Sequence, residues 1–352
     1  MVFFHTADLH LGAGMEANMP QDKAAERRLE LLETFSALVN EAQKADASAV
    51  LIAGDLFDTE TPAPTTVNRV ASVIEAHPGL DFLILAGNHD GELPVSLTSL
   101  ANVHVFPADR PACYRYGEVA VYGCGDCTRP PDDFPLAEGD CNIVMLHGET
   151  SESATQTGID LRAWRGRHVD YLALGHYHRA DICPLDSRGS YAYAGCPAAR
   201  GFDECGENGY IRLTVENGRI TPVFVPLPGR RMHAFSVDVS DSESPDLIQS
   251  RLYEACRDIP AQDGVRVELK GTLPPGASLP TAALKKVLEQ THWFVKIKDS
   301  TVCKAEADAY RHDISLAGTF IRLVLEEESD PDLAREIISL GVAALRGEET
   351  EL

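Results

Sequence analysis

The stretch VDYLALGHYHRADI, residues 169–182, sets a run of apolar residues directly before two histidines. The apolar half is short and bounded by glycine, which favours a strand buried on both faces. His176 and His178 follow it, one residue apart. In sheets built from alternating strands and helices, ligand sites lie at the carboxyl ends of the strands. The other strand ends of the chain are therefore the place to look for partners of these histidines.

Four further apolar runs end in the same kind of side chain. They are ADLH with Asp8 and His10, GDLFD with Asp55 and Asp58, GNHD with Asn88, His89 and Asp90, and LHGE with His147. Each residue alone has an ordinary explanation, because Asp often caps helices, Asn tolerates turns, and a single histidine is often a hydrogen-bonded core residue. Five such endings in one chain favour a common site.

The residue types at these strand ends suit divalent cations. Imidazole and carboxylate ligands without thiolate fit manganese, iron, zinc or related ions. Two such ions, about 3.5–4 Å apart, polarise a phosphoryl group and make hydroxide from water near neutral pH, and they need a carboxylate to bridge them. The pattern therefore predicts hydrolysis of a phosphate ester.

The order of the elements predicts an α/β protein with one large and one small domain. The chain has 352 residues, 44% of them hydrophobic, which is more than one core usually holds. Strands and helices alternate as far as residue 90, and a run of strands then ends in a hairpin turning at Asn217-Gly218. Two packed sheets with helices outside would hold these strands. Prolines and glycine at residues 225–233 mark the boundary, and a small β-α-β-α-β module follows.

Charge and cysteine content limit the partners and the compartment. The 31 Lys and Arg residues against 54 Asp and Glu residues give a net charge of -23, which repels polyanions unless a basic patch or metal ions meet them. Nine scattered cysteines fit reduced thiols, and Cys124 and Cys127 lack a second pair for zinc. Without an apolar run of about 18 residues or a signal-like start, we expect a cytoplasmic protein that does not enter a membrane.

The motifs resemble a known superfamily when they are taken in order. D-x-H, GD-xx-D, GNHD, a later His-Gly and GH-x-H are similar to the calcineurin-like metallophosphoesterases, over roughly residues 1–230. The spellings HTADLHLG, AGDLFDTETP, LAGNHD and ALGHYHR are most similar to SbcD, the D subunit of the bacterial SbcCD nuclease. Cys196 stands where those relatives usually carry a Gly-Ser-Pro run.

The resemblance implies a fold and a division of the chain. A four-layer α/β/β/α sandwich would occupy residues 1–229, and a smaller α+β capping domain residues 230–303. Terminal helices would occupy residues 304–352, and their apolar stripes would pack on the cap or bind a partner.

The resemblance also implies roles for the site residues. One metal would be held by Asp8, His10, Asp55 and His178. The other would be held by Asp55, Asn88, His147 and His176, which makes Asp55 the bridge. Manganese is the expected metal, with iron, zinc and magnesium as alternatives. His89 would contact the phosphate or protonate the leaving oxygen, and Asp58 would orient His89 or else cap the next helix.

The resulting hypothesis is a DNA exonuclease or endonuclease of DNA repair, working with an SbcC-like coiled-coil ATPase and forming a homodimer. The alternatives are a phosphodiesterase or phosphatase for a small nucleotide-type substrate, and a non-catalytic scaffold. Candidate contacts for substrate phosphates are arginines, most of which are solvated in any protein. They are Arg162, Arg165, Arg167, Arg179, Arg200, Arg230 and Arg231.

Overall fold

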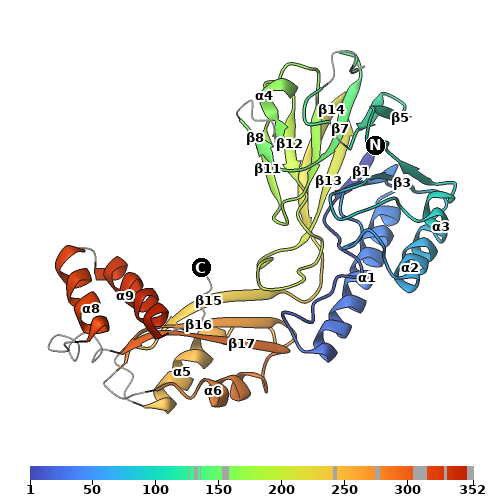
Figure 1. Ribbon diagram of the computed structural model, residues 1–352. Helices are drawn as coiled ribbons and strands as arrows, with labels where there is room; N and C mark the ends of the chain where they lie inside the picture. The colour runs from blue at the N-terminus through green and yellow to red at the C-terminus, as the bar shows by residue number, and fades with distance from the viewer. Residues whose placement is uncertain are drawn as a thin grey trace. The chain divides into compact units, whose positions relative to one another are not determined.

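The computed structural model divides the chain into two compact units, Met1–Met232 and His233–Leu352 (Figure 1). It describes residues 1–125, 127–130, 134, 136–152, 158–240, 244–273, 278–303, 315–328 and 331–346.

The first unit contains a six-stranded sheet with the order β14-β13-β1-β2-β3-β4. Four strands are parallel: β1 (Val2–Thr6), β2 (Ala49–Ala53), β3 (Asp81–Leu85) and β4 (Val103–Val105). The hairpin of β13 (Gly209–Glu216) and β14 (Arg219–Pro226) adds to the edge of β1 in antiparallel fashion. It turns at Asn217 and Gly218, which both have positive φ, as the sequence predicts.

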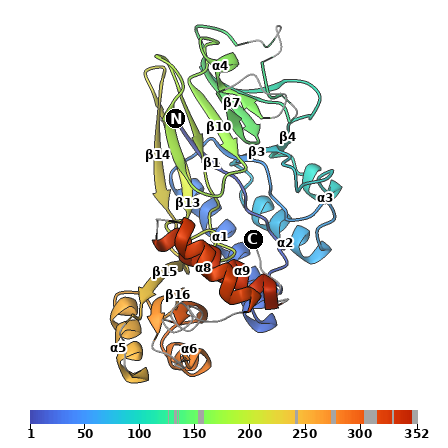
Figure 2. The same ribbon diagram turned by 60° about the vertical axis from the view of Figure 1, so that its left-hand side comes forward.

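Helices cover the outer face of this sheet (Figure 2). They are α1 (Gln21–Lys44), α2 (Pro64–Glu75) and the short α3 (Val95–Thr98). Leu31, Phe35 and Leu38 of α1 are buried at helical spacing, so the apolar stripe of α1 faces inward.

A second six-stranded sheet has the order β11-β12-β10-β7-β6-β5. Its strands are β5 (Ala112–Tyr116), β6 (Val119–Gly123), β7 (Cys141–His147), β10 (Tyr171–Gly175), β11 (Asp181–Pro184) and β12 (Ser190–Tyr193). The stretch YRYGEVAVYG is divided between β5 and β6, because Gly117 has a φ of 58° and turns the chain. Two short strands, β8 (Thr150–Ser151) and β9 (Ile159–Asp160), pair beside this sheet.

The two sheets pack face to face. Phe3 and Leu51 of the first sheet and Ile143 and Tyr171 of the second lie in one buried cluster. The opposite face of the second sheet is covered by α4 (Leu161–Trp164), whose Trp164 is fully buried. The layers therefore run helix, sheet, sheet, helix, and the predicted α/β/β/α sandwich is confirmed.

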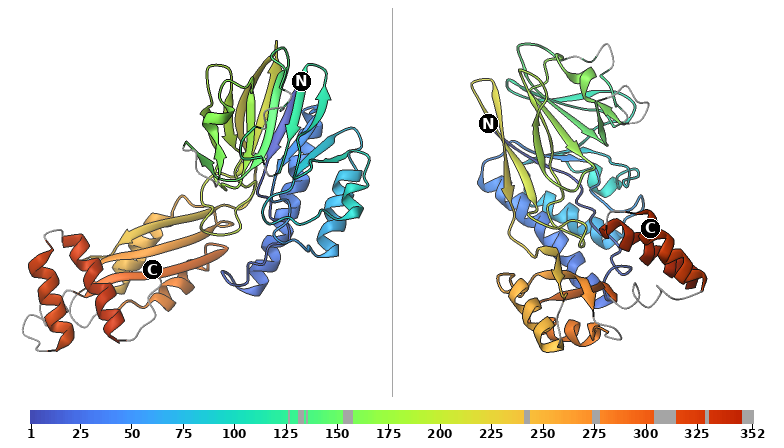
Figure 3. Two further views of the ribbon diagram at one scale, coloured as in Figure 1. Left: turned by 45° about the horizontal axis from the view of Figure 1, so that its top comes forward. Right: turned by 90° about the vertical axis from the view of Figure 1, so that its left-hand side faces the viewer.

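The second unit contains a three-stranded sheet of β15 (Met232–Asp238), β16 (Gly264–Leu273) and β17 (Phe294–Cys303). Helices α5 (Pro245–Cys256) and α6 (Thr281–Leu288) cover one face of this sheet (Figure 3). These are the five elements of the predicted β-α-β-α-β module. Helices α8 (Leu316–Glu327) and α9 (Pro331–Arg346) pack against each other. The capping role of residues 230–303 stays a prediction.

Two further expectations concern cysteines and membranes. Cys124 and Cys127 are joined by a disulfide, so the expectation of reduced thiols is wrong for this pair. The CxxC spacing places the two side chains close enough to join. Among the residues that the structure describes, no helix is both long and apolar enough to cross a bilayer.

Candidate metal centre

The five polar strand ends meet at one edge of the sandwich. Strands β1, β2 and β3 are parallel, as are β7 and β10, so each sheet brings its carboxyl ends to one edge. Main-chain bonds join the loops there: the Asp8 amide donates to the Gly54 carbonyl at 3.1 Å, and the His10 amide to the Asp55 carbonyl at 3.0 Å. The His176 amide donates to the Asp8 carboxylate at 2.9 and 3.0 Å.

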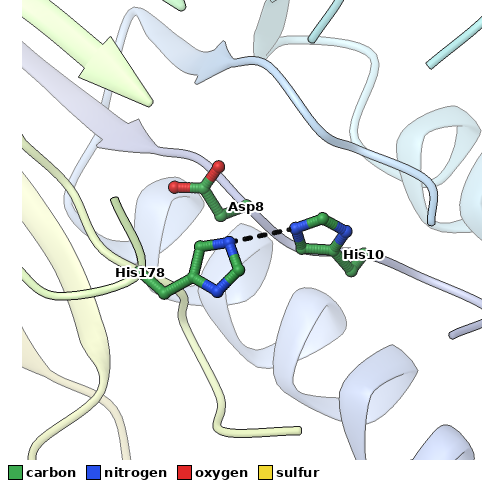
Figure 4. Close-up of side chains that lie close together, drawn as sticks. All are labelled: Asp8, His10 and His178. Carbon is green, nitrogen blue, oxygen red and sulfur yellow. Dashed lines mark hydrogen bonds between the residues drawn. The ribbon is translucent and has the colours of Figure 1, made fainter. Parts of the chain in front are cut away.

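One group of ligand atoms comes from Asp8, His10 and His178 (Figure 4). The Nε2 atoms of the two histidines lie 3.3 Å apart. Two imidazole nitrogens have about this separation when both bind one cation with bonds of roughly 2.1 Å. These three residues were predicted to share one metal.

A second group comes from Asn88, His147 and His176. Oδ1 of Asn88 lies 2.9 Å from Nε2 of His147 and 3.3 Å from Nδ1 of His176. The structure therefore also brings together the residues predicted for the other metal.

Asp55 lies between the two groups. Its Oδ2 atom is 3.5 Å from Nε2 of His10 and 3.5 Å from Nε2 of His147. The side chain of Asp55 is almost fully buried, at 2% exposed. A single carboxylate oxygen equidistant from both groups is what a bridging ligand requires.

The hydrogen bonds of His147 leave a place for a cation. Its Nδ1 lies 2.9 Å from the carbonyl oxygen of Ala53, which can only accept, so Nδ1 carries the proton. In the neutral ring, Nε2 then presents a lone pair to the carboxylate oxygen of Asp55. Two lone pairs that face each other need a proton or a cation between them, and these residues therefore fit a divalent metal.

Burial sets the charge state of the centre. It raises the pKa of Asp8 to about 6. Burial and then the charge of Arg200 lower the pKa of His10 to about 3, so this ring is neutral and able to bind a cation. For Asp55, burial favours the neutral acid, but the interactions with His147, the backbone amide of His89 and His10 together lower the pKa to about 2. The proposed bridge is therefore ionised at neutral pH.

The loops hold their ligands in an uncommon backbone conformation. Asp8, His10, Asp55 and His176 have φ of 52°, 44°, 53° and 110°, and they are four of the seven non-glycine residues with positive φ in the described part of the chain. Non-glycine residues with positive φ are uncommon, because the surrounding structure must hold the backbone in this strained conformation. Strained residues of this kind cluster at functional sites.

Two motif glycines are needed because the ligands approach them closely. A Cβ atom on Gly54 would lie 2.0 Å from Nδ1 of His147, and one on Gly87 would lie 2.2 Å from Oδ1 of Asp55. The glycines of GD and GN are therefore part of the metal centre, since any side chain there would displace a ligand.

Glu204, which the sequence did not reveal, belongs to the centre together with Arg200, which was expected as a phosphate contact. Glu204, 8% exposed, accepts a hydrogen bond of 2.7 Å from Nδ1 of His178. Arg200 donates to Glu204 at 2.7 Å and to the Asp58 carboxylate at 2.9 Å. A carboxylate behind a metal-binding histidine fixes its tautomer and ring orientation. No strand leads into Glu204, so the strand-end pattern could not reveal it.

Asp90, the last residue of GNHD, joins two of the loops. Its carboxylate accepts from the amides of Leu56 at 3.1 Å, Phe57 at 2.9 Å and Gly87 at 3.0 Å. It therefore fixes the loop of Asp55 against the loop of Asn88.

Asp58 and His89 are arranged differently from the expectation. Nδ1 of His89 lies 3.4 Å from the backbone carbonyl of Asp58, while the Asp58 carboxylate lies 3.0 Å from Nδ1 of His10 and 2.9 Å from Arg200. The expectation that this carboxylate orients His89 is corrected, because Arg200 and His10 attract it. Asp58 is not a helix cap either, since Ala63 precedes α2.

Most of the candidate arginines already have acidic partners. Arg162 pairs with Asp160, Arg165 with Glu152, Arg200 with Glu204 and Asp58, Arg230 with Glu26 and Glu30, and Arg231 with Glu207. Within the described residues, Arg167 and Arg179 make no ion pair. Arg179 is exposed and directly follows His178.

Two pockets lie beside the centre, and no residue lines both. The first, about 890 Å³, is lined by the proposed ligands Asn88, His147 and His176 and by apolar residues such as Phe106. The second, about 750 Å³, is lined by His178 and by tyrosines.

The sequence of residues 1–180 matches the family model described as calcineurin-like phosphoesterase. The chain belongs to this family. Members bind two divalent metals, and the described residues form candidate groups for them at Asp8, Asp55 and the histidines around them. This metallophosphoesterase is 24% identical over 369 residues to the uncharacterized metallophosphoesterase YhaO of Bacillus subtilis, covering 94% of this chain and 88% of YhaO.

Solved structures of similar proteins include TT1561 of Thermus thermophilus, with a TM-score of 0.38 and 11% identity over 63% of this chain and 98% of that one. Another is a dimetal phosphatase from Danio rerio, with a TM-score of 0.40 and 10% identity over 62% of this chain and 93% of that one.

Proposed function

We propose that this metallophosphoesterase is a two-metal phosphodiesterase. The proposed ligands are Asp8, His10, Asp55 and His178 for one metal, and Asp55, Asn88, His147 and His176 for the other. The observation that carries the proposal is the position of Asp55 Oδ2, 3.5 Å from an imidazole nitrogen of each group. Bound divalent ions would supply Lewis acidity to the phosphoryl group and lower the pKa of an attacking water toward about 7.

His89 is the proposed acid for the leaving oxygen. Its backbone amide donates to Asp55 Oδ1 at 3.0 Å, and its ring packs edge-on against His10 with centroids 4.9 Å apart. The Asp58 carbonyl lies 3.4 Å from Nδ1, a long contact that leaves Nε2 of this exposed ring to act on the substrate. Imidazole suits this role because its ring nitrogens can both donate and accept a proton.

The proposed substrate is DNA, cleaved as an exonuclease or endonuclease in DNA repair, with manganese as the metal and iron, zinc or magnesium as alternatives. The motif spellings shared with SbcD support this proposal. The net charge of -23 requires local cations at the site, and Arg179 is the candidate beside His178. A small nucleotide-type diester or monoester is the competing substrate, since an acidic surface repels it less.

An SbcC-like coiled-coil ATPase is the proposed partner of this chain, which is proposed to form a cytoplasmic homodimer. Helices α8 and α9 support the proposal, because Leu316 is 72% exposed and Leu323 53% exposed on α8, and Leu345 46% exposed on α9.

The double variant Leu316→Glu with Leu323→Glu should abolish co-purification of the ATPase. If the ATPase supplies the positive groove for DNA, it should steepen the salt dependence of DNA binding, and an identical slope without it would contradict this role. Light scattering of the purified chain tests the homodimer.

The experiment that tests the function compares two aspartates that both have positive φ. Asp55→Asn should lose metal and at least a hundredfold in kcat/KM with manganese, on DNA ends or on bis(p-nitrophenyl) phosphate. Asp46→Asn, an exposed position with φ of 50°, is the matched control and should keep both. Activity that survives Asp55→Asn would contradict the proposal.

The choice of substrate decides among the alternatives. Faster hydrolysis of DNA ends than of cyclic nucleotides or p-nitrophenyl phosphate supports the nuclease, and the reverse order supports the small-substrate enzyme. If the wild-type protein binds two manganese ions but cleaves none of these substrates, it is a scaffold.

A further inference from the structure

We propose that the pocket beside His178 binds a nucleobase of the substrate. This pocket, here called the tyrosine pocket, is lined by Tyr177, His178, Arg179, Tyr191 and Tyr193, among other residues. The inference rests on the proposed function and names part of its substrate. Tyr177 is the stacking surface, and Arg179 contacts the phosphate that follows the base.

The tyrosine pocket adjoins the metal centre at His178. This residue lines the pocket, and its Nε2 atom lies 3.3 Å from His10 Nε2. The proposal places one substituent of a phosphate held at the centre at the mouth of this pocket. The volume of about 750 Å³ lies within the range of roughly 300–1,000 Å³ that small-molecule sites have, and it admits a nucleoside.

The ring of Tyr177 is exposed but fixed. It is 42% exposed, although it lies between two half-buried histidines of the motif. Its hydroxyl donates to Glu149 at 2.8 Å, and its ring meets Tyr193 edge-on with centroids 4.7 Å apart. A flat aromatic surface that is already held in place loses little conformational entropy when a base stacks on it.

Charge decides which part of the substrate lies where. Arg179 makes no ion pair within the described residues, whereas Arg200 nearby is engaged by Glu204 and Asp58. Carboxylates also line the tyrosine pocket, including Asp181 and Glu207. These carboxylates repel a phosphate from the interior but can accept hydrogen bonds from base amino groups. The phosphate is thus expected at the mouth, near Arg179.

The second pocket explains why the substrate should be a diester. It is lined by Asn88, His147 and His176, which are proposed ligands of the other metal, and no residue lines both pockets. A phosphodiester has two substituents, one for each pocket, whereas a monoester would leave one pocket without a ligand.

The test measures binding of adenosine 5′-monophosphate and of ribose 5-phosphate, which lacks the base, to the manganese-loaded protein by isothermal titration calorimetry. Tyr177→Ala should lower the affinity for the nucleotide by roughly 5- to 150-fold, which is the usual effect of losing one stacked base. The loss should be at least fivefold larger for the nucleotide than for ribose 5-phosphate. Tyr177→Phe, which keeps the ring, should stay within threefold of the wild type.

Controls separate stacking from a structural effect. Tyr253→Ala removes a tyrosine that is 40% exposed in the other unit, and it should change neither affinity. Arg179→Gln should lower the slope of log affinity against log salt by about 0.7 for a single-stranded oligonucleotide, while Arg212→Gln, an exposed arginine of β13, should not.

Two outcomes would overturn the inference but not the proposed function, provided that bis(p-nitrophenyl) phosphate is still hydrolysed. The first is that the wild type binds both ligands with equal affinity. The second is that Tyr177→Ala lowers the affinity for both ligands equally. If the wild type hydrolyses no diester with manganese, the proposed function fails, and the inference fails with it.

Discussion

Nδ1 of His178 donates a hydrogen bond of 2.7 Å to Oε1 of Glu204. Burial alone would raise the pKa of Glu204, but the bond from His178 and the charge of Arg200 lower it to about 2, so the carboxylate stays ionised. The same bond raises the pKa of His178. The proton on Nδ1 leaves the Nε2 lone pair directed at the metal centre, so Glu204 sets the orientation of a proposed ligand.

Replacing Glu204 should therefore weaken the metal centre without removing a ligand. Glu204→Gln should lower manganese affinity and kcat/KM by about 10- to 100-fold. Glu216→Gln is the control, because Glu216 is an exposed residue at the end of β13 and its replacement should have little effect. Calorimetric titration of manganese measures the affinity, and equal values for the two variants would show that the hydrogen bond has no part in metal binding.

His89 and His178 should fail in different ways. His89→Ala should keep both metals and lose about 10²- to 10⁴-fold in kcat, because it removes a proton donor and no ligand. His178→Ala should lose metal as well as turnover. Elemental analysis alongside kinetics distinguishes the two, and variants that both retain full metal and full rate would refute the assignment of both residues.

Gly87 should not tolerate even a methyl group. In Gly87→Ala the new Cβ would lie 2.2 Å from Oδ1 of Asp55, and relief of this clash should cost about 1–3 kcal/mol of stability and reduce metal binding. Gly79→Ala is the matched change, since a Cβ there meets nothing within 4 Å. Urea unfolding and manganese titration of both variants provide the comparison, and the prediction is lost if they behave alike.

Stability should depend on pH through His5. This ring is fully buried against Tyr171, and burial lowers its pKa to about 3. Because the pKa is lower in the folded state, the neutral ring contributes fully to stability at pH values above the unfolded-state pKa of about 6.5. This contribution to the free energy of unfolding is lost as the pH falls toward 3. Between pH 7 and pH 5 the wild type should lose about 2 kcal/mol from this residue. His5→Asn should remove that part of the pH dependence in urea unfolding, and parallel curves for both proteins would show that His5 does not titrate as stated.

The strand ends show how far the sequence reaches. Residues such as Asp8, Asp55 and His176 could be placed from the sequence because each follows an apolar strand, and parallel strands end at one edge of a sheet. The same alternation of strands and helices predicted the layered fold. The hairpin turn at Asn217 and Gly218 could be predicted because a two-residue turn needs positive φ at both positions.

Contacts between distant segments were decided only by the tertiary structure. Arg200 reaches Asp58 across 142 positions of the chain, and Asp58 therefore faces His10 rather than His89. Glu204 lies in an irregular segment after β12, where no periodicity marks it. Local spacing determined which residues the strands deliver to the site, whereas their hydrogen-bond partners and the pockets beside them depend on packing between the sheets and their loops, which no single segment encodes.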